Sequence, residues 1–206
     1  MPGIEVPDVV IGRLPIYLRS LTHLLERGQE FTSSQELSQI LGIGSAQIRK
    51  DLSHFGEFGK QGTGYEISYL REQISKILHV DRDWSIALVG FGALGQAIAH
   101  YGGFASKGFH IKAIFEADPS KIGQKVNSIV VENVSNLDET LSKQQIKMAI
   151  IAVPAAAAQE VTDRLVEAGV RAILNYAPIT LNVPDHVRIQ YIDPVVYLQR
   201  MTYYLT

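Results

Sequence analysis

The chain has 206 residues, of which 46% are hydrophobic and 19% are charged, and its formal net charge is −2. These values are ordinary for a soluble globular protein and leave room for one large domain or two smaller ones. No stretch approaches the roughly 18 apolar residues of a membrane span, and residues 1–5 lack the layout of a secretion signal, so we expect a cytoplasmic protein with no membrane partner. The absence of cysteine excludes disulfides, thiolate catalysis and cysteine zinc sites. We expect no metal site, and any redox role requires a bound cofactor.

The first eighty residues predict a small helical unit. Apolar residues at helical spacing predict a helix that has Pro15 in its first turn and ends at Gly28. Ser33 and Glu36 form a capping box for a short second helix. Ser45 then caps a third helix. Two short helices joined by a few residues form a helix-turn-helix.

The outward face of the third helix carries hydrogen-bonding and cationic side chains. The candidates for contact with double-stranded DNA are Ser45, Ala46, Gln47, Arg49 and Lys50. Arginine can bridge guanine O6 and N7, glutamine can bridge adenine N6 and N7, and lysine supplies a phosphate contact. The alternative is a solvated helix face, which Asp51 and a net charge of −1 over residues 1–80 favour. The three-helix context favours DNA.

Residues 55–67 alternate glycine with aromatic and polar side chains, a pattern typical of a β-hairpin wing. Lys60 near its tip is a further candidate for a phosphate contact, and the alternative is a mobile turn. A fourth helix is expected over residues 68–78, and the charged residues 80–83 form a domain junction. We therefore place a winged helix-turn-helix DNA-binding domain at residues 1–80.

An apolar run at residues 86–89 leads directly into a glycine-rich turn that opens a helix, so that backbone N–H groups can face a pyrophosphate. The candidate cofactor-binding residues of this turn are Gly90, Phe91, Gly92, Ala93, Leu94 and Gly95. Glu116 ends the next strand, about twenty residues past the last glycine, where a carboxylate binds ribose hydroxyls and repels a 2′-phosphate. We expect NADH/NAD⁺ as the cofactor, against the alternative of an ordinary strand-to-helix turn.

Beyond Glu116, strands and helices alternate, which predicts an α/β fold with a Rossmann-like doubly wound parallel sheet over residues 81–193. The expected strands are 129–131, 148–153, 172–175 and 187–192, and the expected helices between them are 135–143 and 155–169. Val153 and Pro154 close one strand and are expected to border the cofactor. Residues 194–206 form an apolar, aromatic helix, which packs on its own sheet or on a partner subunit. We assign this helix to dimerisation.

Four segments together closely resemble the Rex family of redox-sensing transcriptional repressors: residues 14–17, 45–52, 55–60 and 90–95. The resemblance implies a homodimer that binds an inverted-repeat operator when NADH is scarce and releases it when NADH binds. It also implies a C-terminal helix swapped between subunits, and a pairing of Tyr101 with Asp193 of the partner subunit. Some family members carry an arginine where this chain has Ala93, so one possible charged contact to the cofactor is absent.

Two other functions fit the glycine fingerprint. A dehydrogenase usually needs a general acid or base, but the six histidines are scattered and none forms a recognisable catalytic pair with a carboxylate. We therefore expect a regulator and not an enzyme. A binder of CoA or of another nucleotide stays open, because glycine loops accept several pyrophosphates.

Overall fold

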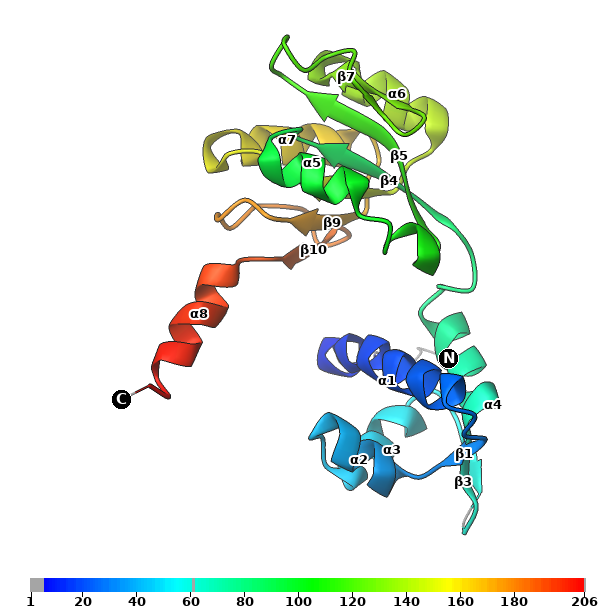
Figure 1. Ribbon diagram of the computed structural model, residues 1–206. Coiled ribbons are helices and arrows are strands. Elements are labelled where there is room, and N and C mark those ends of the chain that lie inside the picture. Colours follow the sequence, from blue (N-terminus) through cyan, green and yellow to red (C-terminus); the bar gives the residue numbers. More distant parts are fainter. Residues whose placement is uncertain (1–5, 61, 206) are drawn as a thin grey trace. The chain divides into compact units, whose positions relative to one another are not determined.

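The computed structural model describes residues 6–60 and 62–205. The chain forms two compact units that are divided between Arg82 and Asp83 (Figure 1). Each unit has its own hydrophobic core, so each is described by itself.

The first unit combines helices with a small antiparallel sheet. Its helices are α1 (Asp8–Glu26), α2 (Ser34–Leu41), α3 (Ser45–Ser53) and α4 (Ile67–Ile77). Within the described residues, its strands pair in the order β1-β3-β2, with β1 at Phe31–Thr32, β2 at Gly59–Lys60 and β3 at Gly64–Glu66. Strands β2 and β3 form the predicted hairpin wing. The core holds apolar side chains from all four helices, including Leu14, Leu37, Ile48 and Ile74.

Two predicted helix starts are wrong. Helix α1 begins at Asp8, so Pro15 lies inside the helix instead of in its first turn. The apolar stripe already includes the buried Val10, and Pro15 itself is exposed, where the loss of one backbone hydrogen bond is best tolerated. Helix α3 is capped by Gly44, and Ser45 is already its first helical residue. The predicted cap at Ser33 is confirmed, because its Oγ accepts a hydrogen bond from the backbone N–H of Glu36 in α2 at 3.1 Å.

The second unit is built on a sheet that is seven-stranded within the described residues, with the order β10-β9-β8-β4-β5-β7-β6. The strands are β4 (Trp84–Val89), β5 (Phe109–Glu116), β6 (Lys125–Val126), β7 (Ile129–Asn133), β8 (Met148–Ile151), β9 (Ala172–Asn175) and β10 (Arg188–Tyr191). All neighbours are parallel except β6 and β7. From the neighbouring strands β4 and β8 the strand order runs outward in opposite directions, toward β6 on one side and toward β10 on the other. In doubly wound sheets, ligands bind at such a switch point.

Helices cover both faces of this sheet (Figure 1). The helices of this unit are α5 (Ala93–His100), α6 (Leu137–Gln144), α7 (Ala155–Glu167) and α8 (Pro194–Thr202), with short 3₁₀ turns at Ala105–Lys107 and Val134–Asn136. Along β4, Leu88 packs in the cluster that includes Ile98 of α5. The next residue, Val89, packs in the cluster that includes Leu165 of α7. This alternation confirms a sheet with helices on both sides.

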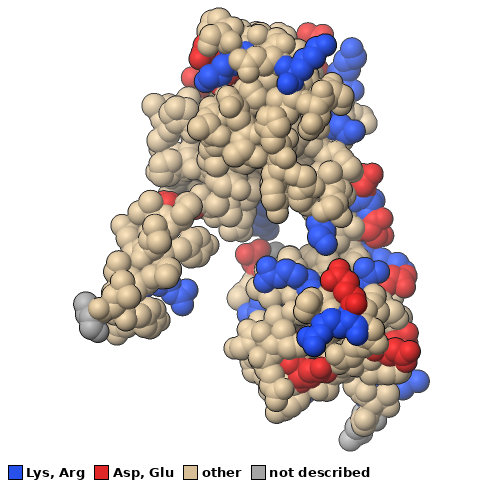
Figure 2. Space-filling model, in the orientation of Figure 1, with Lys and Arg blue, Asp and Glu red and all other residues tan. Residues whose placement is uncertain are grey.

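Helix α8 contributes no residue to these cores. Five of its apolar side chains are each more than half exposed: Val195, Val196, Tyr197, Leu198 and Met201. Figure 2 shows the helix as an almost uncharged surface, and Arg200 is the basic residue in its last turn. Among the described residues, no helix has the length and apolar character needed to cross a membrane.

Candidate functional site

The glycine-rich turn connects β4 to α5 at the switch point of the sheet. Gly90 has a φ of +98°, and a Cβ there would collide with the carbonyl oxygen of Ala152. A Cβ on Gly95 would collide with the carbonyl oxygen of Gly90, so α5 packs directly against the turn. Gly92 differs, because a Cβ there would meet nothing within 4 Å. Two glycines are therefore required by packing, and the third keeps space open at the N-terminus of α5.

Glu116, at the end of β5, lies against this turn. Its Oε2 accepts a hydrogen bond from the Phe91 backbone N–H at 2.8 Å, and its Oε1 accepts from the N–H groups of Ala117 at 2.6 Å and Asp118 at 3.0 Å. Lys121 Nζ lies 3.6 Å from Oε2. Burial acts to raise the pKa of Glu116, but the three N–H donors and Lys121 outweigh it and hold the pKa below its ordinary value. The site therefore presents an ionised carboxylate.

A cavity of about 200 Å³ lies beside the turn and contains the predicted residues Gly90, Glu116, Val153 and Pro154 in its wall. These residues come from the carboxyl ends of β4, β5 and β8, which is where doubly wound sheets bind nucleotides. Arg164 of α7 also lines the cavity, and the sequence analysis missed it. The signal that could have identified Arg164 is its position on the side of α7 that faces the cavity.

The other candidate cofactor residues lie at the start of α5, at the end of α5 and at the start of α8. Ala93 and Leu94 begin α5, and Leu94 is exposed. Tyr101 follows α5, is 62% exposed, and packs edge-on against Phe104 with ring centroids 5.1 Å apart. Asp193 caps α8, where its Oδ1 accepts a hydrogen bond from the backbone N–H of Val195 at 2.9 Å. The pairing of Tyr101 with Asp193 of the partner subunit stays a prediction.

Helix α3 presents a polar surface while its apolar side is anchored in the core. Ile48 and Leu52 are buried. The candidate DNA-binding residues Ala46, Gln47, Arg49 and Lys50 are exposed, and Ser45 is half-buried. The helix is therefore anchored in the core on its apolar side, with its polar side chains available to a ligand.

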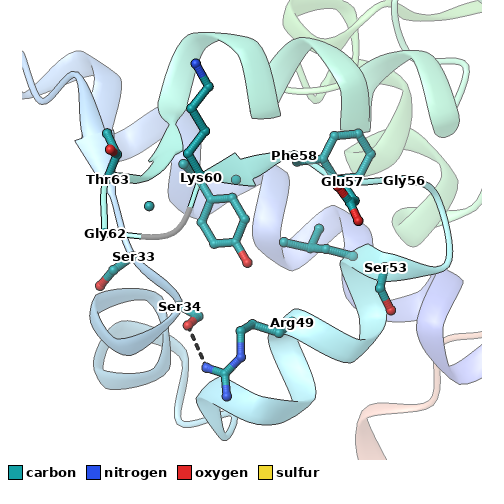
Figure 3. Close-up of a pocket in the computed structure, with 14 residues that line it drawn as sticks. Ser33, Ser34, Arg49, Ser53, Gly56, Glu57, Phe58, Lys60, Gly62 and Thr63 are labelled. Atoms are coloured by element: carbon teal, nitrogen blue, oxygen red, sulfur yellow. Dashed lines mark hydrogen bonds between the residues drawn. The ribbon is translucent and has the colours of Figure 1, made fainter.

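A cavity of about 560 Å³ separates α3 from the hairpin wing. The Arg49 Nη1 donates a hydrogen bond to Ser34 Oγ, 3.0 Å away at the start of α2, and the two side chains point toward each other (Figure 3). Lys60 lines the same cavity from β2 but extends away from this pair (Figure 3). The structure thus places Arg49 beside a helix N-terminus, where anions bind favourably.

Asp51 is fully buried, which contradicts its interpretation as a sign of a solvated face. Its carboxylate accepts hydrogen bonds from Arg13 Nε at 2.5 Å, Arg13 Nη2 at 2.7 Å, Tyr17 Oη at 2.6 Å and Gln47 Nε2 at 2.7 Å. Burial acts to raise the pKa of Asp51, but Arg13, Tyr17 and Gln47 together hold it below its ordinary value. Burial and the bond to Asp51 raise the pKa of Tyr17. We call these four residues the Asp51 cluster.

Comparison with known proteins places the chain in a family. A family model described as a CoA binding domain matches residues 81–179, and one described as a putative DNA-binding protein N-terminus matches residues 5–53. The redox-sensing transcriptional repressor Rex of Chloroflexus aggregans is 56% identical over 98% of this chain and 95% of its own length. The chain belongs to the Rex family. The Rex of Streptomyces coelicolor is 44% identical over 97% of this chain and 77% of its own length.

Solved structures of a Rex-family repressor, RSP, have the same fold. RSP in complex with β-NAD⁺ and operator DNA superimposes with a TM-score of 0.93 at 40% identity, covering 97% of this chain and 92% of RSP. RSP in complex with β-NADH gives a TM-score of 0.89 at 37% identity, covering 98% of this chain and 94% of RSP. The Rex relatives are named as repressors and not as enzymes, which confirms that this chain belongs to a family of regulators.

Proposed function

We propose that this Rex-family chain is a homodimeric transcriptional repressor of the cytoplasm. It binds inverted-repeat operator DNA when the NADH/NAD⁺ ratio is low and dissociates when NADH binds. The observation that carries the proposal is the presence, in one chain, of a core-anchored helix α3 with a polar outer face and of a glycine turn with an ionised Glu116. The names of its Rex relatives and the ligands of RSP support it.

The residues around the glycine turn fit NAD(H). The open space at Gly92 admits a pyrophosphate to the N–H groups that begin α5. Glu116 accepts hydrogen bonds from ribose hydroxyls, and its charge repels the 2′-phosphate of NADPH. Val153 and Pro154 border the same cavity. The bound dinucleotide supplies the redox state that the protein reads, because its nicotinamide is charged in one form and neutral in the other.

The exposed helix α8 supports the homodimer. Its apolar side chains lie outside every core of the chain's described parts, and burying them against a second copy stabilises the dimer. An exchanged terminal element is a common basis for such a dimer. In that assembly Tyr101 pairs with Asp193 of the partner subunit at the nicotinamide end of the cofactor.

NADH and operator DNA must weaken each other's binding affinity by the same factor, since coupling between two binding sites is reciprocal. We expect operator DNA to weaken NADH binding about 5- to 150-fold, and NADH to weaken operator binding equally. Titration of NADH with and without an operator duplex measures this, with NAD⁺ and unrelated DNA as controls. Equal NADH affinities in the two titrations would contradict it. CoA, added as a competitor, tests the alternative that the family-model description favours, and we expect it not to displace NADH.

Replacement of Arg49 by alanine tests how α3 meets DNA. Because Arg49 lies beside Ser34 at the start of α2, we expect it to contact a phosphate. R49A then weakens binding to operator and to unrelated DNA by similar factors, and reduces the slope of log affinity against log salt by about 1. Arg27→Ala, an exposed position after α1, is the control. A loss confined to one base-pair position would instead show that Arg49 reads a base.

A further inference from the structure

We propose that Asp51 is a positioning residue that fixes the amide of Gln47 so that Gln47 reads adenine in the operator. The inference rests on the proposed DNA-binding function and deepens it, since it names the base and the residue that sets the choice. Four hydrogen bonds of the Asp51 cluster carry it.

The partners of Asp51 set its charge state. Its side chain is fully buried and is paired with the guanidinium of Arg13 through two hydrogen bonds. Tyr17 Oη donates a further bond to the same carboxylate from α1. These donors stabilise the ionised form, and an ionised carboxylate accepts hydrogen bonds but donates none. Asp51 therefore imposes a donor on any side chain that contacts it.

Gln47 lies one helical turn before Asp51 on α3. Its Nε2 lies 2.7 Å from Asp51 Oδ1, and only the nitrogen of the amide can donate to a carboxylate. The amide oxygen must therefore point away from Asp51. Within residues 6–60 and 62–205, no side chain or backbone group donates to this oxygen, and Gln47 is exposed. Gln47 thus presents one acceptor and its second N–H donor.

The acceptor and the donor that Gln47 presents match the edge of one base. In the major groove adenine offers the N6 donor beside the N7 acceptor, which pairs with an amide oxygen and an amide N–H. Guanine offers two acceptors, so one of them faces the amide oxygen unfavourably. Thymine offers an acceptor and a methyl group, and cytosine offers a single donor. Of the four bases, adenine alone satisfies both groups that Gln47 presents.

Gln159 of α7 shows that the same spacing does not by itself create a reader. Its Nε2 donates to Asp163 Oδ1 at 2.7 Å, as Gln47 does to Asp51. The Gln159 amide oxygen, however, accepts a hydrogen bond from the Asn182 backbone N–H at 2.9 Å. Both ends of that amide are occupied. Gln159 is therefore a matched control in the other unit of the chain.

The experiment uses the full chain and a duplex operator selected by the wild-type protein from random sequences. Each position is then substituted symmetrically in both half-sites, and affinities are measured at several salt concentrations. We expect Q47A to lose the preference for adenine at one position by about 5- to 150-fold per half-site, with an unchanged salt slope. We expect Q159A to match the wild type. D51N supplies an amide that donates to the Gln47 oxygen and lets it turn, so the preference at that position shifts from adenine toward guanine.

Q47N keeps an amide at an exposed position, so it tests the inference even where D51N does not fold. Its shorter side chain cannot contact Asp51 and a base edge together, and we expect it to lose the adenine preference as Q47A does. A Q47A pattern identical to the wild type at every position would overturn the base contact. A Q47N or folded D51N protein that keeps the adenine preference would overturn the role of Asp51. If the wild type selects no inverted repeat at all, the proposed function itself fails.

Discussion

Replacing Gly92 with valine is expected to abolish the release of DNA by NADH while leaving DNA binding intact. Gly92 caps α5, and the direction in which its Cβ would point is empty. A valine side chain fills the space that a pyrophosphate needs in order to reach the N–H groups of the helix. Each hydrogen bond to a charged group contributes about 1.5–3 kcal/mol. The loss of two such bonds between the helix N–H groups and the pyrophosphate therefore weakens NADH binding by more than about 100-fold.

Calorimetric titration of NADH and a gel shift on the operator with and without NADH measure the two effects separately. Gly12→Val is the matched control, because a Cβ on Gly12 of α1 also meets nothing within 4 Å. We expect G12V to bind NADH as the wild type does. If G92V still released DNA at ordinary NADH concentrations, the pyrophosphate would have to bind elsewhere. If G92V lost DNA binding as well, with a lowered melting temperature, misfolding would explain both losses.

The glycine turn and its neighbouring carboxylate were predictable because their signals are local. A strand, three glycines and a helix start follow one another within residues 84–100, and the backbone requirements at Gly90 and Gly95 leave few other residue types possible. Glu116 was found by its spacing along the next strand, and its contact with Phe91 at 2.8 Å gives that spacing a physical meaning. The parallel sheet followed from the alternation of elements.

The Asp51 cluster was not predictable in this way, because its partners are joined only by the tertiary fold. Arg13 lies 38 residues before Asp51 and one turn before Tyr17 on α1. The sequence does contain a weak signal, since Gln47 and Asp51 stand one helical turn apart. A charged residue on a short helix is usually solvated, and only burial by α1 reverses that expectation here. Strands β1 and β6 were missed because two residues show no periodicity.

Replacing Arg13 with alanine is expected to destabilise the first unit by about 3 kcal/mol at neutral pH. Removing one partner of a buried ion pair leaves an uncompensated buried charge, which costs about 3–5 kcal/mol. The lower end applies because the Arg13 side chain is 21% exposed and because Tyr17 and Gln47 still donate to Asp51. Hydrogen exchange of the α1 and α3 amides measures the loss. Trp84, the one tryptophan of the sequence, lies on β4 and reports by fluorescence that the second unit is unchanged.

The pH dependence of this loss separates charge from packing. The pKa of Asp51 is lower in the folded chain than its ordinary unfolded value of about 3.9. The stability that its pairing contributes is therefore complete above that value and is lost as the pH falls through the folded pKa. Because protonation also removes the unpaired charge in R13A, we expect the difference between wild type and variant to shrink below about pH 4. If the stability difference between wild type and R13A persists in acid, the destabilisation comes from lost packing of the aliphatic part of the Arg13 side chain. Lys76→Ala, which breaks the exposed pair with Glu72 in the same unit, should cost far less at every pH.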